Sequence, residues 1–270
     1  MIPFSLRRRI ALALLLLLTA LSLLLWNAGD RLLYNTRFTT GWLLWTLMVL
    51  LAAFNVRKKL PYLPLLSNST WLQIHIYLGY FTLVIFTLHI DLRAPDGYME
   101  LGLALLYGLA IISGLIGLAL SRIVPGRLRI RGEAVIFERH PALLNQLRQE
   151  LEAQALVRGQ GATIADFYAR RLIAFFARPR HLVWHLLQSN RPLVTLLNEF
   201  TAQERFLDAN GKKQHAAIVQ LIRQKATLDY HYAHQAALKY WLFLHIPLSY
   251  SLLLLGLVHG ALAHAYRGGI

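Results

Sequence analysis

The sequence predicts an all-α fold: an integral membrane helical bundle of about five transmembrane helices with a mostly helical cytoplasmic insert. Hydrophobic residues make up 56% of the 270 residues and charged residues only 15%, well below the quarter or so that is charged in soluble domains. The mean hydropathy is +0.45, and the apolar residues gather in long runs. A soluble core cannot easily absorb this much apolar surface, so the composition indicates a chain that spans a lipid bilayer.

Five apolar runs are candidates for membrane spans, which need about 20 residues each. The first run follows three arginines and is longer than the core of a secretory signal, so we interpret it as an uncleaved membrane anchor. The second run is short. The five runs are residues 10–27, 40–56, 71–91, 101–121 and 239–265.

Basic residues orient these spans, because cytoplasmic loops carry an excess of Lys and Arg. Basic clusters precede the first run, separate the second from the third, and follow the fourth, so five spans put all of them on one side. The clusters are Arg7, Arg8 and Arg9; Arg57, Lys58 and Lys59; and Arg122, Arg127, Arg129 and Arg131. We therefore expect a multi-pass protein of a prokaryotic cytoplasmic (inner) membrane, with its N-terminus in the cytoplasm and its C-terminus outside.

Three parts of the chain are expected: spans one to four in residues 1–121, a helical cytoplasmic insert in 122–238, and the fifth span with a short outer tail in 239–270. The insert holds 17 Lys and Arg against nine acidic residues. Its sequence predicts a small hairpin in RLRIRGEAVIFER, followed by four helices. These helices are expected near 141–157, 163–177, 181–198 and 213–237.

The charge and the lack of cysteine limit the function. The net charge of +15 does not indicate nucleic acid, because membrane proteins carry this cytoplasmic excess of basic residues anyway. We expect the basic insert to meet anionic lipid headgroups or an acidic partner, and no nucleic acid. Without cysteine, the chain cannot form disulfides, cysteine-held iron–sulfur clusters or covalently attached c-type haem.

Two of the predicted spans carry a histidine pair with the same spacing, His75 and His89 in the third span and His245 and His259 in the fifth. Ionisable residues inside a membrane are costly and are functional candidates by default. Fourteen residues rotate a helix by roughly 1400°, about 40° short of four turns, and rise about 21 Å. The two rings of each helix therefore lie near one face, one toward each edge of a hydrocarbon core about 30 Å thick.

The third and fifth spans are separated by one span, so they run parallel to each other. His75 and His245 are then expected at one depth near the inside, and His89 and His259 at another near the outside. Haem iron accepts axial histidine, and imidazole binds metals in its neutral form. The sequence thus predicts two b-type haems, an inner one held by His75 and His245 and an outer one held by His89 and His259.

Three residues near these histidines fit this interpretation. Gly79 and Gly256 would let a porphyrin approach the backbone. Pro247 cannot donate to the carbonyl of Phe243 and is expected to bend the fifth span. The bend either sets the inner ligand or is an ordinary feature of membrane helices, in which proline is tolerated.

The paired H-x13-H spans resemble the transmembrane core of ferric reductases and NADPH oxidases, and more broadly the di-haem membrane cytochromes b. The resemblance covers spans three to five. It implies that the four histidines ligate haem and that electrons move between an inner and an outer b haem. It does not extend to a flavin domain, because no dinucleotide fingerprint follows the last span, and the large insert has no counterpart in those families.

The predicted function is that of a di-haem b-type cytochrome subunit of an oxidoreductase complex. It would transfer electrons across the membrane between quinone or a partner protein on one side and a redox partner on the other. The alternative is a histidine-lined proton or metal-ion transporter, which is disfavoured because no Asp or Glu lies between the paired histidines. A third alternative is a structural anchor whose insert binds a partner.

Two further histidine pairs lie in the insert. His181 and His185, in HLVWH, lack the Glu of a zinc-protease helix and are expected on an amphipathic, interfacial helix. His231 and His234, in DYHYAHQ, share a helical face and could bind a metal. We favour the interpretation that this second pair anchors the chain at the membrane interface.

Overall fold

The computed structural model describes residues 4–31, 36–54, 67–130, 136–155 and 162–266. Every regular element in these ranges is a helix, which confirms the predicted all-α class for the described part of the chain. The chain divides into two compact units. One comprises residues 1–118 and 243–270, and the other residues 119–242.

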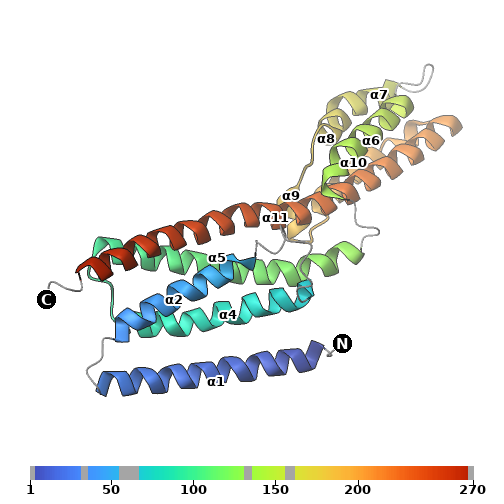
Figure 1. Ribbon diagram of the computed structural model, residues 1–270. Coiled ribbons are helices and arrows are strands. Elements are labelled where there is room, and N and C mark those ends of the chain that lie inside the picture. The colour runs from blue at the N-terminus through green and yellow to red at the C-terminus, as the bar shows by residue number, and fades with distance from the viewer. Residues whose placement is uncertain (1–3, 32–35, 55–66, 131–135, 156–161, 267–270) are drawn as a thin grey trace. The chain divides into compact units, whose positions relative to one another are not determined.

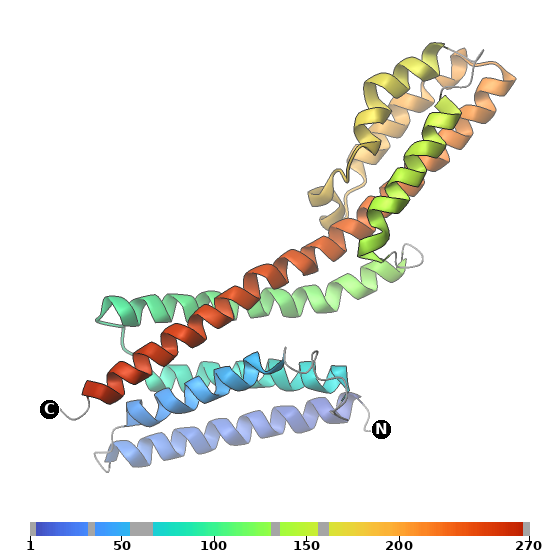
Figure 2. The ribbon, with the colours of Figure 1, turned by 45° about the horizontal axis from the view of Figure 1, so that its top comes forward.

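In the described part of the first unit there are five helices. Two of them, α5 and α11, continue into the second unit (Figure 1). Within this unit, α4 packs against α1 and α2, and α2 lies alongside α4 in Figures 1 and 2. The five helices are α1 (Phe4–Arg31), α2 (Thr36–Ala52), α4 (Asn68–His89), α5 (Tyr98–Ile130) and α11 (Ala209–Ala265).

Four of these helices, α1, α4, α5 and α11, are long and apolar enough to cross a membrane. The second predicted span corresponds to α2, which is helical over 17 residues, or about 26 Å. It is therefore somewhat shorter than a hydrocarbon core of about 30 Å.

A small apolar core holds α2, α4, α5 and α11 together. Tyr107 on α5 stacks on Phe86 of α4 with ring centroids 4.1 Å apart, and its hydroxyl donates to the Oγ1 of Thr82 at 3.1 Å. A buried tyrosine needs such a partner for its hydroxyl. The core residues are Leu44, Leu47, Phe81, Ile85, Leu88, Tyr107 and Leu252.

The second unit is a set of short helices packed on the N-terminal part of α11. Its elements are η1 (Phe137–Arg139), α6 (His140–Ala155), α7 (Ala162–Phe167), the π-helical η2 (Tyr168–Leu172), α8 (Ile173–Phe176), α9 (Leu182–Leu186), α10 (Arg191–Thr201) and η3 (Glu204–Phe206).

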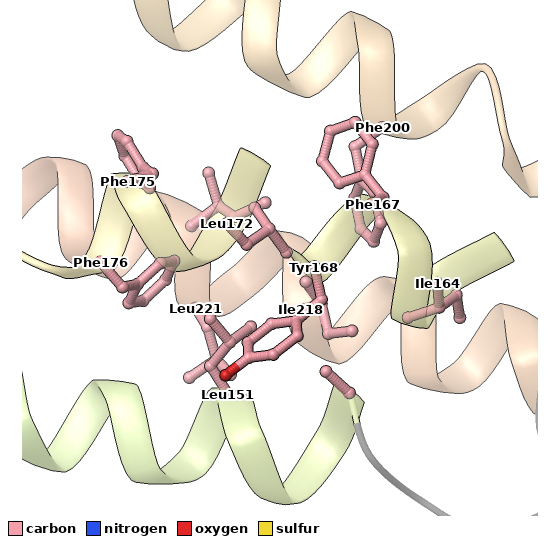
Figure 3. Close-up of a cluster of buried hydrophobic side chains, with 12 residues drawn as sticks. Leu151, Ile164, Phe167, Tyr168, Leu172, Phe175, Phe176, Phe200, Ile218 and Leu221 are labelled. Carbon is pink, nitrogen blue, oxygen red and sulfur yellow. The ribbon is translucent and has the colours of Figure 1, made fainter. Parts of the chain in front are cut away.

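Figure 3 shows the apolar core of the second unit, in which aromatic side chains, among them Phe200 of α10, meet leucine and isoleucine side chains from α6, α7, η2 and α11. The rings of Phe167 and Phe200 lie 5.0 Å apart, and the ring of His215 on α11 stacks on Phe200 at 4.2 Å. Burial of this apolar surface stabilises the unit.

Three sequence-based expectations for the insert are wrong. The first arm of the predicted hairpin is helical, because α5 continues through Pro125 to Ile130; residues 131–135 lie outside the described part. The helix expected at 181–198 is two helices, α9 and α10, separated where Gln188 adopts a left-handed φ of 60°.

The third difference concerns the end of the helix expected at 213–237. The helix expected at 213–237 and the fifth span form one helix, α11, of 57 residues. No glycine or proline occurs between Gly211 and Pro247, so nothing in the local sequence interrupts the hydrogen-bond ladder. The change from charged to apolar residues alters the environment of the helix without ending it.

Candidate functional site

The outer histidine pair meets across α4 and α11. His89 is the last residue of α4, and its ring faces that of His259 with centroids 6.4 Å apart and planes at 82°. Both side chains are half-buried. The sequence-based expectation placed these two residues at one depth, and the structure brings their rings side by side.

The tautomer of His89 follows from its hydrogen bond. Its Nδ1 lies 2.9 Å from the carbonyl oxygen of Arg37 on α2. A carbonyl can only accept, so Nδ1 carries the proton and donates. The Nε2 atom is then the nitrogen with a lone pair, as in metal-binding histidines whose other nitrogen donates to a carbonyl.

Gly41 on α2 makes room for the His89 ring. A Cβ at position 41 would lie 2.8 Å from Cε1 and 3.2 Å from Nδ1 of His89. In a helix, a side chain leans toward the N-terminus and covers the preceding turn. A side chain at position 41 would therefore cover the carbonyl of Arg37, one turn earlier, which His89 uses.

The predicted inner pair is His75 on α4 and His245 on α11. The ring of Phe54, which follows α2, lies 5.1 Å from that of His75. On the α5 side, a Cβ at Gly114 would lie 3.8 Å from Cε1 of His245. Helices α2 and α5 thus border the inner pair.

Helix α2 supports the His89 ring through a peptide carbonyl, that of Arg37. Sequence reasoning missed this role of α2. A backbone carbonyl has no side-chain signature, and Arg37 would not attract attention as a supporting residue.

The two glycines expected to face a porphyrin differ in their surroundings. A Cβ at Gly79 would have nothing within 4 Å, whereas a Cβ at Gly256 would lie 3.4 Å from Cδ1 of Trp45. The Trp45 indole donates to the carbonyl of Leu253 at 3.2 Å. Gly256 therefore allows close packing of α2 on α11. Pro247 lies within the continuous helix α11.

The other histidine-rich segment is buried inside the second unit, so the expectation that it anchors the chain at the membrane interface is wrong. His231 and His234 are both buried, and the Nδ1 of His234 pairs with the carbonyl of Tyr230 at 2.9 Å. The ring of His185 on α9 lies 6.0 Å from that of Tyr230. Aromatic packing around Tyr230 makes these residues part of the core.

A buried ion pair also lies in this unit and was not found from the sequence. Lys225 and Asp229 on α11 are both fully buried and pair with each other. The amide of Arg180 donates to Oδ2 of Asp229 at 3.1 Å, and Lys225 donates to the carbonyl of Arg178 at 3.1 Å. The i,i+4 spacing of Lys225 and Asp229 in the sequence indicates an ion pair on one helix face. It does not indicate burial, because Lys and Asp side chains are usually exposed.

The Lys225–Asp229 pair affects nearby titratable groups. Burial lowers the pKa of His140 to about 4, and the charge of Lys225 contributes in the same direction. Burial raises the pKa of Asp229 to about 6, although Lys225 opposes this rise.

Within the described ranges, no group of three or more His, Cys, Asp or Glu side chains lies together in an arrangement that could hold a metal ion. The two histidine pairs of α4 and α11 provide two imidazoles each. No protein-family model, curated protein sequence or solved structure matches this chain.

Proposed function

We propose that this chain is a di-haem b-type cytochrome subunit of a prokaryotic cytoplasmic membrane. It would transfer electrons across the membrane between quinone or a partner protein on one side and a redox partner on the other. In this proposal α1, α2, α4, α5 and α11 are the five spans, and residues 122–238 are cytoplasmic. The proposed core is similar to the transmembrane core of the ferric reductases and NADPH oxidases.

The proposal rests on the separation of the outer rings. Two imidazoles on opposite faces of one metal have centroids on the order of 6 Å apart, because each metal–nitrogen bond is about 2 Å long. The 6.4 Å between His89 and His259 agrees with this separation. The Arg37 carbonyl adds support, since it leaves Nε2 of His89 as the nitrogen able to bind a metal.

In the proposed protein, His89 and His259 hold the outer haem, and His75 and His245 hold the inner one. The bound haems would supply one-electron redox chemistry. Within α4 and within α11, the paired ligands are fourteen residues apart, about 21 Å along each helix. This spacing would put one site toward each side of a hydrocarbon core about 30 Å thick, as transfer across the membrane requires.

The protein surroundings would orient the ring of His89. Orientation would come from α2, through the Arg37 carbonyl at the outer site. Gly41 lets the outer ring reach its carbonyl.

The test is the haem content of the purified full-length protein. We expect two haems per chain by the pyridine haemochrome assay, and a b-type α-band in the reduced-minus-oxidised spectrum. If haem is supplied during expression and the correctly folded protein binds none, the proposal is contradicted. Binding of a transition metal instead, or proton flux in proteoliposomes, would favour the transporter alternative.

Variants would assign the ligands. His89→Ala and His259→Ala should each remove the same haem, and His75→Ala and His245→Ala the other. His264→Ala is the matched control, because His264 also lies on α11 but is exposed and stacks on Phe38 at 6.0 Å. Two haems in each single ligand variant would contradict the pairing, as would loss of haem in the control.

A further inference from the structure

The short helix α9 in the second unit presents apolar side chains to the outside. Val183, Trp184 and Leu187 are 66%, 42% and 69% exposed. They occupy positions i, i+1 and i+4, which lie within about 100° of one another around a helix. His185, roughly opposite, is buried near Tyr230. These three residues are called the α9 patch below, and they are exposed among the described residues of the chain.

Backbone turns and polar contacts hold the α9 patch in place. His181 before α9 and Gln188 after it adopt left-handed φ angles of 58° and 60°, which are uncommon for residues other than glycine. The side-chain amide of Gln188 donates from Nε2 to the Tyr230 hydroxyl at 2.8 Å. A defined protrusion is favoured over a loosely placed loop, because strained residues persist only where the surroundings determine them.

A hydrogen bond ties α9 to the end of a membrane-spanning helix. The guanidinium of Arg127 on α5 donates to the carbonyl of Leu186 at 2.8 Å. The apolar run of α5 ends at Arg122, five residues or about 8 Å along the axis before Arg127. On α11, Tyr230 lies nine residues or about 14 Å before Lys239, where the apolar run of that helix begins.

These two distances along the helix axes place α9 near the polar headgroup layer of the bilayer. That layer adds about 5 to 8 Å to each side of the hydrocarbon core, and the apolar side chains reach further than the backbone. Tryptophan is enriched at this depth, because its amphipathic ring suits the headgroup region.

The charge around the α9 patch indicates the kind of surface that it meets. Residues 176–198 contain three arginines, Arg178, Arg180 and Arg191, and no acidic residue. Arg178 and Arg191 are exposed. The cytoplasmic leaflet carries anionic lipid, which attracts basic residues close to the membrane surface. An apolar patch flanked by arginines matches the composition of membrane-surface helices.

We propose that the α9 patch inserts into the headgroup region of the cytoplasmic leaflet, where the flanking arginines bind anionic lipid. Val183, Trp184 and Leu187 bury their apolar surface at the headgroup boundary, and Arg178 and Arg191 contact lipid phosphate. The occupant is the bilayer that holds the chain's own membrane helices. This proposal requires a membrane but does not depend on haem.

The test uses the full chain, which has no native cysteine. Val183→Cys would be labelled with an environment-sensitive fluorophore, and the protein would be reconstituted in phosphatidylcholine vesicles with phosphatidylglycerol and a nitroxide quencher near the headgroups. Phe206→Cys is the matched control, because Phe206 is also apolar and 67% exposed but precedes the start of α11. That start is thirty residues or about 45 Å along the helix from Lys239.

We expect a blue-shifted emission and severalfold stronger quenching for the label at position 183 than for the label at position 206. Leu187→Cys should repeat the result at a second exposed position. Equal quenching at the patch and the control would overturn the proposal. A blue shift at position 183 without quenching would mean that protein covers the patch, and would also overturn it.

A separate measurement tests whether the arginines bind anionic lipid. In the labelled protein, Arg178→Gln combined with Arg191→Gln should weaken quenching at position 183, and so should omission of phosphatidylglycerol. Quenching that is unchanged by both would overturn the binding of anionic lipid.

Discussion

The carbonyl of Arg37 accepts a hydrogen bond from Nδ1 of His89 across 2.9 Å. This contact joins the N-terminal end of α2 to the last residue of α4. It connects the proposed outer ligand to a helix that carries none of the four paired histidines, and it depends on the absence of a side chain at position 41.

Replacing Gly41 with alanine should disturb the outer site and leave the inner site unchanged. The added Cβ would lie 2.8 Å from Cε1 of His89, so the ring must rotate or move away from the Arg37 carbonyl. We expect a changed midpoint potential and changed EPR g values for one haem, with the other unaffected. The measurements are a redox titration and low-temperature EPR.

Gly108→Ala is the control for this change, because a Cβ at Gly108 would have nothing within 4 Å. If both variants match the wild type, Gly41 does not position His89. If the wild type itself binds no haem, the proposed function is wrong, and the effect of Gly41 on the His89 ring can still be followed by NMR of the imidazole.

Replacing the side chain of Arg37 should have little effect, although its carbonyl lies at the site. Arg37 also forms an ion pair with Asp91 at 3.0 Å, largely open to solvent. Exposed pairs contribute about 0 to 1 kcal/mol, and Arg37→Gln keeps the backbone carbonyl. Thermal unfolding should shift by a few degrees at most, and the spectrum of the outer haem should be unchanged. A changed spectrum would mean that the guanidinium itself acts on the site.

Removing one partner of the buried Lys225–Asp229 pair should destabilise the second unit strongly. Asp229→Asn leaves the buried ammonium of Lys225 without its counter-charge, which typically costs about 3 to 5 kcal/mol. The combined change Lys225→Met and Asp229→Leu removes both charges and should cost less than Asp229→Asn alone. Chemical denaturation in detergent, followed by the signal of the second unit, measures the difference.

The control for the buried pair is Asp166→Asn, which breaks an i,i+4 pair with Arg170 that is 51% and 71% exposed. Its effect should stay within about 0.5 kcal/mol. Similar losses for Asp166→Asn and Asp229→Asn would show that burial does not strengthen the Lys225–Asp229 interaction.

The stability of the second unit should depend on His140 at mildly acid pH. Because burial lowers the pKa of His140 from 6.5 to about 4, the folded state resists a proton that the unfolded state accepts. The contribution of His140 is fully present above pH 6.5 and is lost as the pH falls toward 4, by about 3 kcal/mol in total.

The measurement for His140 is the difference in melting temperature between wild type and His140→Gln across this pH range. A difference is needed because Asp229, with a pKa raised to about 6, changes the stability with pH in the opposite direction. Its protonation below pH 6 favours the folded state. The wild type should lose stability relative to the variant as pH falls. A difference that does not change with pH would contradict the assignment.

Much of the fold could be predicted from the sequence, because long apolar runs and helical periodicity dominate it. The four long helices follow directly from hydropathy. The continuity of α11 through residues 238 and 239 could not be predicted in this way, since the chain changes there from charged to apolar residues. Hydropathy reports the environment of a helix, whereas its end depends on backbone groups and on residues such as glycine and proline.

The candidate site was predictable to the extent that side-chain chemistry reveals it. The fourteen-residue spacing selects His75, His89, His245 and His259 as candidates, and the structure brings the ring centroids of His89 and His259 to 6.4 Å from each other. The support from α2 could not be predicted, because it comes from a peptide carbonyl and from a missing Cβ. The burial of His231 and His234 could not be predicted either, because it depends on packing by segments distant in sequence, such as α9, whose His185 ring lies 6.0 Å from that of Tyr230.

The α2 carbonyl at His89 has a consequence for mutational tolerance. A peptide carbonyl survives almost any substitution of its own residue, so the protonated nitrogen of His89 is determined by the path of the backbone and not by the identity of residue 37. A residue-by-residue scan would score position 37 as neutral, although its peptide group borders the site. Only at position 41, where any side chain intrudes, would such a scan detect the contribution of α2.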